Sequence, residues 1–296
     1  MKDAFSRCHP VVNLSYFVLV LGFAMALTHP LAQLLSLSCA LCLAIQLTGR
    51  KAVGFSLKCG LPMLLLAAFV NPAFSHEGVT ILLYFPSGNP LTLESILYGL
   101  SAGCLLVTVM TWFLSFNQVL TADKFIYLFG RILPALSLVL SMTLRFIPKF
   151  QHQLHQVVEA QRCLGRDVST GSVWQRTRTA IRILSILITW ALENAIETAD
   201  SMKSRGYGLK GRTAFSIFRF DRRDKAFLVW FGFCGLFLLG GCAAGAFGFR
   251  YFPSIRWAPL NGVTLIFYAV YLALCASPVV YNAAEEKKWK ALYANM

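Results

Sequence analysis

Two residue pairs in this sequence have the spacing of a chemical site, and each has a simpler explanation. His152 and His155 lie three residues apart on a predicted helix, where both side chains could bind one metal ion. Without a triad of cysteines or carboxylates nearby, a solvated helix face is the favoured interpretation. Cys39 and Cys42 have redox-pair spacing but lie among leucines and alanines, where cysteines act as small packing residues. We therefore predict neither a metal site nor a catalytic residue.

Nucleotide chemistry is equally unsupported. The sequence has no G-x-x-x-x-G-K-[ST] loop, whose backbone N–H groups would bind phosphates. The segment GYGLKGRT at 206–213 resembles such a loop only superficially, because its spacing is wrong. We expect this chain to bind no cofactor of its own.

The composition excludes an ordinary soluble domain. Hydrophobic residues make up 57% of the 296 residues and only 14% are charged, against about 25% charged in globular domains. The mean hydropathy is +0.61, so most of this apolar surface must face lipid or other membrane helices. The net charge of +14 could indicate nucleic-acid binding. However, the basic residues lie along predicted helices beside leucine and isoleucine, without an aromatic stacking motif, so a membrane surface and protein partners explain them better.

Long apolar runs, rather than alternating ones, predict an all-α integral membrane protein. About 20 helical residues cross the hydrocarbon layer, and six segments are long enough. We place these spans near 12–28, 31–49, 53–73, 95–116, 226–248 and 259–281.

Lysine and arginine set the orientation, because they accumulate on the cytoplasmic side. The segment 117–225 holds 17 of the 27 basic residues, whereas 74–94 holds none. We predict three parts: residues 1–116 with four spans and the N-terminus inside, a cytoplasmic region at 117–225, and residues 226–296 with two spans and the C-terminus inside. The outer segment 74–94 is interrupted by glycine and proline, and a short hairpin around Pro86–Pro90 is expected there.

The runs 126–147 and 183–196 are also apolar and leave the number of spans open. If both crossed, the basic stretch 149–182 would lie outside, against the positive-inside bias. Polar residues interrupt both runs, Arg131 and Arg145 in the first and Glu193 in the second. Long amphipathic helices in a cytoplasmic region fit this pattern better.

Glycine pairs four residues apart indicate close helix contacts. The pairs Gly99–Gly103 and Gly241–Gly245 would let helix backbones approach closely within a membrane. The sequence does not say whether the contact is made within this chain or with a partner.

The cytoplasmic region contains the most distinctive residues. We expect Pro148, in the run Arg145-Phe146-Ile147-Pro148, to end one amphipathic helix. Gly165 and Gly206 fit helix C-caps, which would leave Arg205 projecting from a last turn. Cations are favoured at the C-terminus of any helix. This general preference explains one helix end with a basic residue beside a glycine more easily than two such ends.

These residues form an ordered set that resembles a known family. The stretch ADSMKSRGYG at Ala199–Gly208, the preceding EAQR at 159–162, TLRFIP at 143–148 and THP at 28–30 resemble the transmembrane T component of energy-coupling factor transporters. The resemblance covers nearly the whole chain and is strongest over about 143–212. These transporters import vitamins and transition-metal ions in prokaryotes.

The resemblance implies that two Ala-Arg-Xaa triplets at the ends of coupling helices dock into two ATP-binding-cassette subunits, which hydrolyse the ATP. Ser204, Arg205, Gly206 and Tyr207 match the second triplet and its surroundings. Cys163-Leu164-Gly165 occupies the place of the first, with leucine where arginine is expected. The neighbouring Arg162 and Arg166 are candidates to supply the charge. Asp200, Arg145 and Pro148 are candidates to support the coupling helices, Asp200 either through an ion pair or as a solvated side chain.

The favoured function is therefore a non-catalytic coupling subunit in the plasma membrane of a prokaryote, with a small membrane S component that binds the substrate. The apolar residues Ile181, Leu184, Ile188 and Leu192 would pack within the chain or on the S component. Two alternatives remain: a self-sufficient secondary carrier, and a membrane anchor for cytoplasmic proteins. The sequence names neither the substrate nor whether the S component is dedicated or shared.

Overall fold

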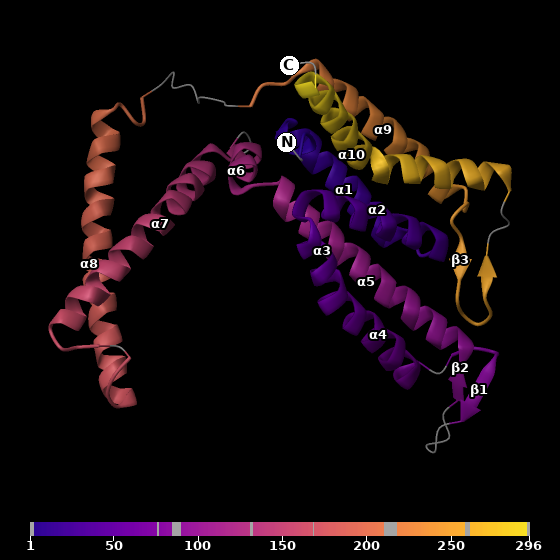
Figure 1. Ribbon diagram of the computed structural model, residues 1–296, viewed down its shortest axis with the longest axis horizontal. Coiled ribbons are helices and arrows are strands. Elements are labelled where there is room, and N and C mark those ends of the chain that lie inside the picture. Colours follow the sequence, from indigo (N-terminus) through magenta and orange to yellow (C-terminus); the bar gives the residue numbers. More distant parts are fainter. Residues whose placement is uncertain are drawn as a thin grey trace. The chain divides into compact units, whose positions relative to one another are not determined.

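The chain is almost entirely helical and divides into two compact units. The computed structural model describes residues 3–75, 77–84, 90–130, 133–167, 169–209, 218–257 and 261–294. The first unit combines residues 1–125 with 218–296, and the second unit holds residues 126–217. Figure 1 shows long helices with two small hairpins, which confirms the predicted all-α class.

The first unit consists of long helices joined by short turns. Its helices in chain order are η1 (Phe5–Arg7), α1 (Pro10–Ala26), α2 (Pro30–Thr48), α3 (Arg50–Phe55), the π-helical turn η2 (Ser56–Gly60), α4 (Leu61–Phe74), α5 (Leu93–Val119), α9 (Arg222–Ala243) and α10 (Gly262–Ala294). The segments α3, η2 and α4 form one continuous apolar helix. The helix α6 (Ala122–Gly130) leads from the first unit into the second.

Two of these helices begin at a His-Pro dipeptide. His9 and His29 are the N-caps of α1 and α2, and their Nδ1 atoms accept hydrogen bonds from the Val11 and Leu31 N–H groups at 3.3 and 3.2 Å. Proline follows as the first helical residue, where its missing N–H costs nothing.

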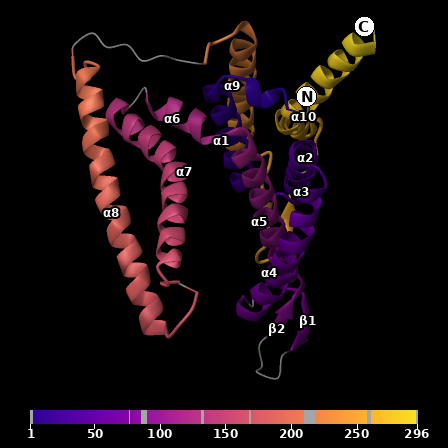
Figure 2. The same ribbon diagram turned by 60° about the vertical axis from the view of Figure 1, so that its left-hand side comes forward.

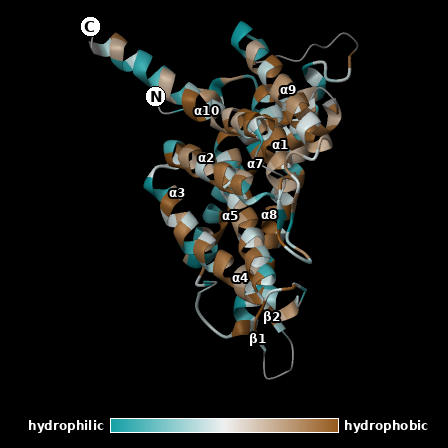
Figure 3. Cartoon of the chain, turned by 90° about the vertical axis from the view of Figure 1, so that its right-hand side faces the viewer, coloured by the Kyte–Doolittle hydropathy of each residue, from teal (hydrophilic) through white to brown (hydrophobic). Residues whose placement is uncertain are grey.

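Among the described residues, six helices are long and apolar enough to cross a membrane. Five of them are α2, the continuous α3–α4 helix, α5, α9 and α10, and each contains or overlaps a predicted span. The sixth is α8 (Val173–Ser204), and the shorter apolar α1, with 17 residues, covers the remaining predicted span. Figure 3 shows hydrophobic residues along the helices of the first unit and a hydrophilic C-terminal end of α10. The chain is therefore a multi-pass membrane protein.

Large aromatic side chains fill the core of the first unit. Tyr16, Phe17 and Trp112 are fully buried, and the rings of Tyr16 and Trp112 meet edge to face, with centroids 6.0 Å apart. Their polar atoms have partners: Trp112 Nε1 donates to Ser36 Oγ at 2.9 Å, and the Tyr16 hydroxyl donates to the Cys275 carbonyl at 2.9 Å. These bonds connect α1, α2, α5 and α10 in a region that offers no water.

The glycines of α5 bring it against α4 within this chain. A Cβ on Gly99 would lie 2.8 Å from the Ala67 carbonyl oxygen, and one on Gly103 would lie 3.0 Å from the Leu64 Cα. The pair Gly99–Gly103 therefore makes its close helix contact within this chain. In the second pair, only Gly241 packs, against Phe267 of α10. Gly245 has a φ of +72° and no neighbour within 4 Å, so it ends α9 rather than packing a helix.

We expect Gly99→Val to destabilise the protein by about 2 kcal/mol, because the added side chain meets backbone that cannot rotate away. The measurement is the thermal unfolding midpoint in detergent. Gly232→Val on α9 is the matched control, since a Cβ there meets nothing within 4 Å. Equal midpoints for the two variants would show that the α4–α5 contact is not as close as described.

The segment 74–94 contains the expected hairpin. The strands β1 (Ile81–Tyr84) and β2 (Pro90–Thr92) pair antiparallel, and residues 85–89 at the predicted tip lie outside the described residues. Glu94 in the first turn of α5 is buried, and its carboxylate accepts hydrogen bonds from the Thr80 N–H and hydroxyl groups. A second, unpredicted hairpin pairs β3 (Phe249–Arg250) with β4 (Arg256–Trp257).

A buried lysine ties the N-terminal segment to the end of α5. Lys124 is 7% exposed, and its Nζ donates to the Ser6 carbonyl and, at 2.8 Å, to the Val119 carbonyl. In the orientation that satisfies both ends of its amide, Asn13 accepts from Lys124 Nζ at 3.0 Å and donates to the Phe5 carbonyl. The lysine therefore joins η1, α1 and α5 just before the chain enters the second unit.

The second unit is an antiparallel pair of long helices, α7 (Pro134–Cys163) and α8 (Val173–Ser204). Val157 of α7 packs with Ile183 and Leu187 of α8 in a small apolar core. Nearby, the Phe150 and Trp190 rings meet edge to face at 5.7 Å. Figure 2 shows the two helices side by side.

The prediction that Pro148 ends a helix is wrong. The helix α7 continues through Pro148 to Cys163. Proline removes one backbone hydrogen bond, and Figure 2 shows α7 bending along its length. Directly after the proline, Lys149 bonds to Asn194 of α8 and its Nζ lies over the Trp190 ring.

Candidate functional site

The candidate docking residues lie at the C-terminal ends of α7 and α8, and both ends have the same backbone geometry. Gly165 and Gly206 have φ values of +74° and +78°, the left-handed conformation that glycine adopts without strain. At the end of α7, the Gly165 N–H bonds to the Arg162 carbonyl and the Arg166 N–H to the Gln161 carbonyl. This hydrogen-bond pair is a Schellman motif, which satisfies carbonyls that the helix end leaves open.

The end of α8 repeats these two bonds. The Gly206 N–H bonds to the Lys203 carbonyl and the Tyr207 N–H to the Met202 carbonyl, each at 3.0 Å. Both predicted glycine caps are thus present. The end of α9 has the same motif around Gly245, so the backbone alone does not define a docking site. A docking site at either helix end must therefore be defined by the side chains that are exposed there.

The α8 end presents Arg205 at the C-cap position. The Arg205 side chain is exposed, and it makes no hydrogen bond or ion pair with any residue in the described part of the chain. Ser204 is exposed, and its hydroxyl donates back to the Ser201 carbonyl at 2.9 Å. Tyr207 is 46% exposed. The Arg205 guanidinium is therefore available to a partner.

The α7 end presents a leucine at the same position. Leu164 is the C-cap and is 66% exposed. Arg162 Nε lies 3.5 Å from Asp167 Oδ2, so this arginine is partly neutralised within the turn. Arg166 is exposed. The structure thus brings Arg162, Gly165 and Arg166 together, with neither arginine at the position that Arg205 holds in α8.

The proposed supporting residues are exposed. Asp200 lies on the surface of α8 and forms no ion pair with any described residue, which favours its solvated alternative. Arg145 and Pro148 are exposed on α7, far in sequence from either helix end.

One apolar face of α8 has no partner among the described residues of its own unit. Ile181, Leu184, Ile188 and Leu192 are between 51% and 62% exposed. None of the four belongs to the small core between α7 and α8, so their packing stays a prediction. The contact with α7 uses Ile183, Leu187 and Trp190 instead. Sequence reasoning missed these three because α8 is apolar on two faces, and both faces repeat at helical spacing.

The antiparallel packing places the two helix ends at opposite ends of the pair. Val157 of α7 packs beside Leu187 of α8. From there, at 1.5 Å per residue, α7 continues for about 9 Å to its end and α8 for about 26 Å in the other direction. The ends are thus roughly 35 Å apart along the pair.

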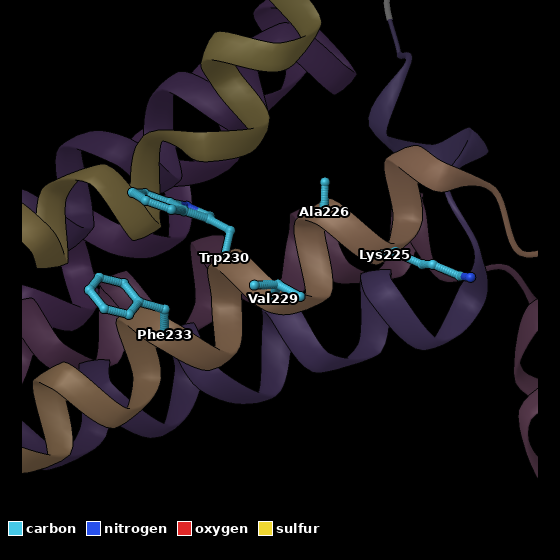
Figure 4. A pocket seen from close by; sticks show the side chains of 5 residues that line it. All are labelled: Lys225, Ala226, Val229, Trp230 and Phe233. Atoms are coloured by element: carbon cyan, nitrogen blue, oxygen red, sulfur yellow. The ribbon is translucent and has the colours of Figure 1, made fainter.

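Elsewhere the described residues offer little for chemistry. They contain no group of three histidine, cysteine or acidic side chains able to hold a metal ion, and all nine cysteines are free thiols. The phosphate-loop look-alike at 206–213 lies partly outside the described residues. Figure 4 shows a shallow hollow on α9, an apolar surface with one cation at its edge, lined by Lys225, Ala226, Val229, Trp230 and Phe233.

The comparisons with known proteins agree with one another. The model of the family CbiQ, described as a cobalt transport protein, matches residues 4–215. Several similar proteins carry the name energy-coupling factor transporter transmembrane protein EcfT. The one from Lacticaseibacillus paracasei is 35% identical over 107 residues, 36% of this chain and 39% of that protein. Those from Bacillus selenitireducens and Bacillus subtilis are 37% and 33% identical over 97 and 95 residues, each 32% of this chain and 36% of the relative. The chain therefore spans about two fifths of the length of these relatives.

Proposed function

Because the chain belongs to the CbiQ family, we propose that it is the transmembrane coupling subunit of an ATP-driven importer. One observation carries the proposal: a helix pair whose two ends share one backbone motif, lie roughly 35 Å apart, and expose arginine side chains. Such a pair can engage two subunits at once. The names of the EcfT relatives, all transporter components, support the same assignment.

In this proposal, the helix ends transmit motion rather than perform catalysis. ATP closure is a rigid-body movement of two subunits, and the membrane part must be held by both subunits to follow it. The Arg205 guanidinium can donate several charge-assisted hydrogen bonds to carboxylates or carbonyls in a groove. The helices α7 and α8 then act as levers on the membrane part.

The proposed partners are two ABC-type ATPases, which bind and hydrolyse the ATP, and a small membrane S component, which binds a vitamin or metal ion. The exposed face of α8 formed by Ile181, Leu184, Ile188 and Leu192 is available to the S component. A self-sufficient carrier would need a polar site inside the membrane. Among the described polar side chains of the apolar helices, Ser36 and Gln33 bond to Trp112 and Ser101, whereas Gln46 Oε1 and Asn71 Nδ2 are buried without a hydrogen-bond partner.

We propose that both termini and the α7–α8 pair are cytoplasmic. Length and composition alone would let α8 cross a membrane. The charge pattern favours the cytoplasm, because Arg176, Arg178 and Arg182 lie in its first three turns and would otherwise be outside.

Labelling of Cys163 tests this topology, because the thiol is exposed at the end of α7. We expect a membrane-impermeant maleimide to label Cys163 only after the cells are opened. If α7 and α8 both crossed the membrane, the turn that follows Cys163 would be outside. The control is Val79→Cys in the outer segment, where Val79 is 68% exposed. This variant should react in intact cells, and equal labelling of Cys163 there would refute a cytoplasmic pair.

The function itself is tested by the composition of the complex. We expect the tagged chain, isolated from its native membrane in mild detergent, to bring two cassette ATPases and one small apolar membrane protein. Mass spectrometry identifies them. Isolation of the chain alone, stable and monodisperse, would favour the carrier. Partners without an ATPase would favour the membrane anchor.

A further inference from the structure

The hollow on α9 combines an apolar surface with a cation at one end. Lys225, Val229 and Phe233 follow one another at four-residue spacing, so they lie on one face of the helix. Ala226 and Trp230 complete the lining. In Figure 4 the Lys225 side chain extends toward the start of α9, away from the apolar residues. The three large apolar side chains are exposed, so the first unit leaves this face largely uncovered.

A second cation extends this face toward the start of the helix. Arg222 precedes Lys225 by three residues and therefore lies on the same face. Both side chains are exposed, and neither forms a hydrogen bond or an ion pair with a described residue. The acidic neighbours are engaged elsewhere: Asp221 pairs with Arg223 at 3.8 Å, and the buried Asp224 accepts a hydrogen bond from the N-cap residue of α1 at 3.1 Å. The two cations thus remain available to an external anion.

The order of cations and apolar side chains along α9 matches the layers of a membrane. The helix is one of those long and apolar enough to span it. At about 1.5 Å per residue, Trp230 lies about 8 Å and Phe233 about 12 Å beyond Lys225 along the helix. The polar layer on each side of the hydrocarbon is roughly 5–8 Å thick. With Lys225 at the level of the lipid phosphates, Trp230 therefore lies at the edge of the hydrocarbon, where tryptophan is favoured, and Phe233 lies within it.

We propose that this face of α9 binds a phospholipid with an anionic headgroup. Its phosphate accepts charge-assisted hydrogen bonds from Arg222 and Lys225, and one acyl chain lies along Val229 and Phe233, beside Trp230. The positive end of the helix dipole adds to the attraction. A zwitterionic headgroup carries its own cation, so its phosphate gains less from the two side chains.

A lipid fits this face better than an acidic protein surface, because the apolar part of the face continues into the hydrocarbon layer. The site does not involve the ends of α7 and α8, so it goes beyond the proposed function and can fail without it.

Quenching of Trp230 fluorescence tests the proposal. The full chain is reconstituted into vesicles of phosphatidylcholine and phosphatidylglycerol, in which one lipid or the other has brominated acyl chains that quench a tryptophan they touch. The difference between the wild type and Trp230→Phe isolates the signal of Trp230 from those of the other tryptophans. We expect phosphatidylglycerol to be enriched roughly 10-fold over phosphatidylcholine at Trp230, because each nearby cation attracts an anionic lipid several-fold.

Removal of both cations, in Arg222→Gln/Lys225→Gln, should abolish this enrichment. The matched control is Arg50→Gln/Lys51→Gln, which removes the same charge from the first turn of α3, where two adjacent residues do not share a face. The control should keep the enrichment. All four side chains are exposed, so neither double variant should change the unfolding midpoint in detergent.

Three results would overturn the proposal. The first is equal quenching of Trp230 by the two brominated lipids in the wild type, or no quenching by either, which would show that protein covers the face. The second is an unchanged preference in Arg222→Gln/Lys225→Gln. The third is an equal loss in both double variants, which would show that the total charge, rather than this face, attracts the lipid.

Discussion

Reversal of one charge, Arg205→Glu, should abolish the association of this chain with its ATPases while leaving it folded in the membrane. The exposed guanidinium makes no bond with any described residue, so the folded chain loses no contact of this side chain. Truncation of a desolvated arginine at an interface costs roughly 2 kcal/mol or more, about 30-fold in affinity. In the proposed docking, a carboxylate at this position would in addition repel the acceptor groups that bind the guanidinium.

The measurement is the amount of ATPase recovered with the tagged variant, together with ATP-driven uptake. Glu193→Lys is the control charge reversal, because Glu193 is exposed near the middle of the same helix, away from both docking ends. Full recovery and uptake with Arg205→Glu would remove Arg205 from the docking site. Equal losses in both variants would indicate a general effect of charge on α8.

Replacement of the buried lysine, Lys124→Met, should destabilise the first unit by about 3 kcal/mol, because several buried acceptors lose their donor at roughly 1 kcal/mol or more each. These acceptors are the Ser6 and Val119 carbonyls and the Asn13 amide oxygen. Burial lowers the pKa of Lys124, because removal of the charged ammonium group from water is unfavourable.

Thermal unfolding in detergent measures this loss. Lys225→Met is the control, because Lys225 is exposed on α9. We expect a clearly lower midpoint for Lys124→Met and an unchanged midpoint for Lys225→Met. Equal midpoints would show that water replaces the lysine donor and that the N-terminal segment does not depend on it.

The features that could be predicted from the sequence are the helix ends and the membrane spans, because both depend on residues that are close together in the chain. Glycine is the residue that adopts a positive φ at a helix end, so Gly165 and Gly206 could be assigned from their positions alone. The membrane spans could be predicted from the lengths of the apolar runs, because the thickness of the hydrocarbon layer sets how many helical residues are needed to cross it. The family resemblance to T components agrees with the match to residues 4–215.

The remaining features depend on contacts that composition does not reveal. A helix continues through Pro148 because residues after it pack on α8, and no sequence signal distinguishes that from a stop. The face of α8 that contacts α7 differs from the one expected, since Ile183 and Ile181 are equally apolar. Lys124 was counted only as one basic residue among many, although it is buried.

We propose that the two helix ends move with two ATPases, and this motion can be measured. It is tested most directly by the distance between spin labels at Glu159→Cys and Glu197→Cys, exposed positions one to two turns before the ends of α7 and α8. The labels are placed in a background without the nine native cysteines, in the complex with both ATPases. Because closure on ATP brings the two subunits together, we predict a shorter distance with trapped ATP than without nucleotide. The same distance distribution in both states would contradict transmission through this helix pair.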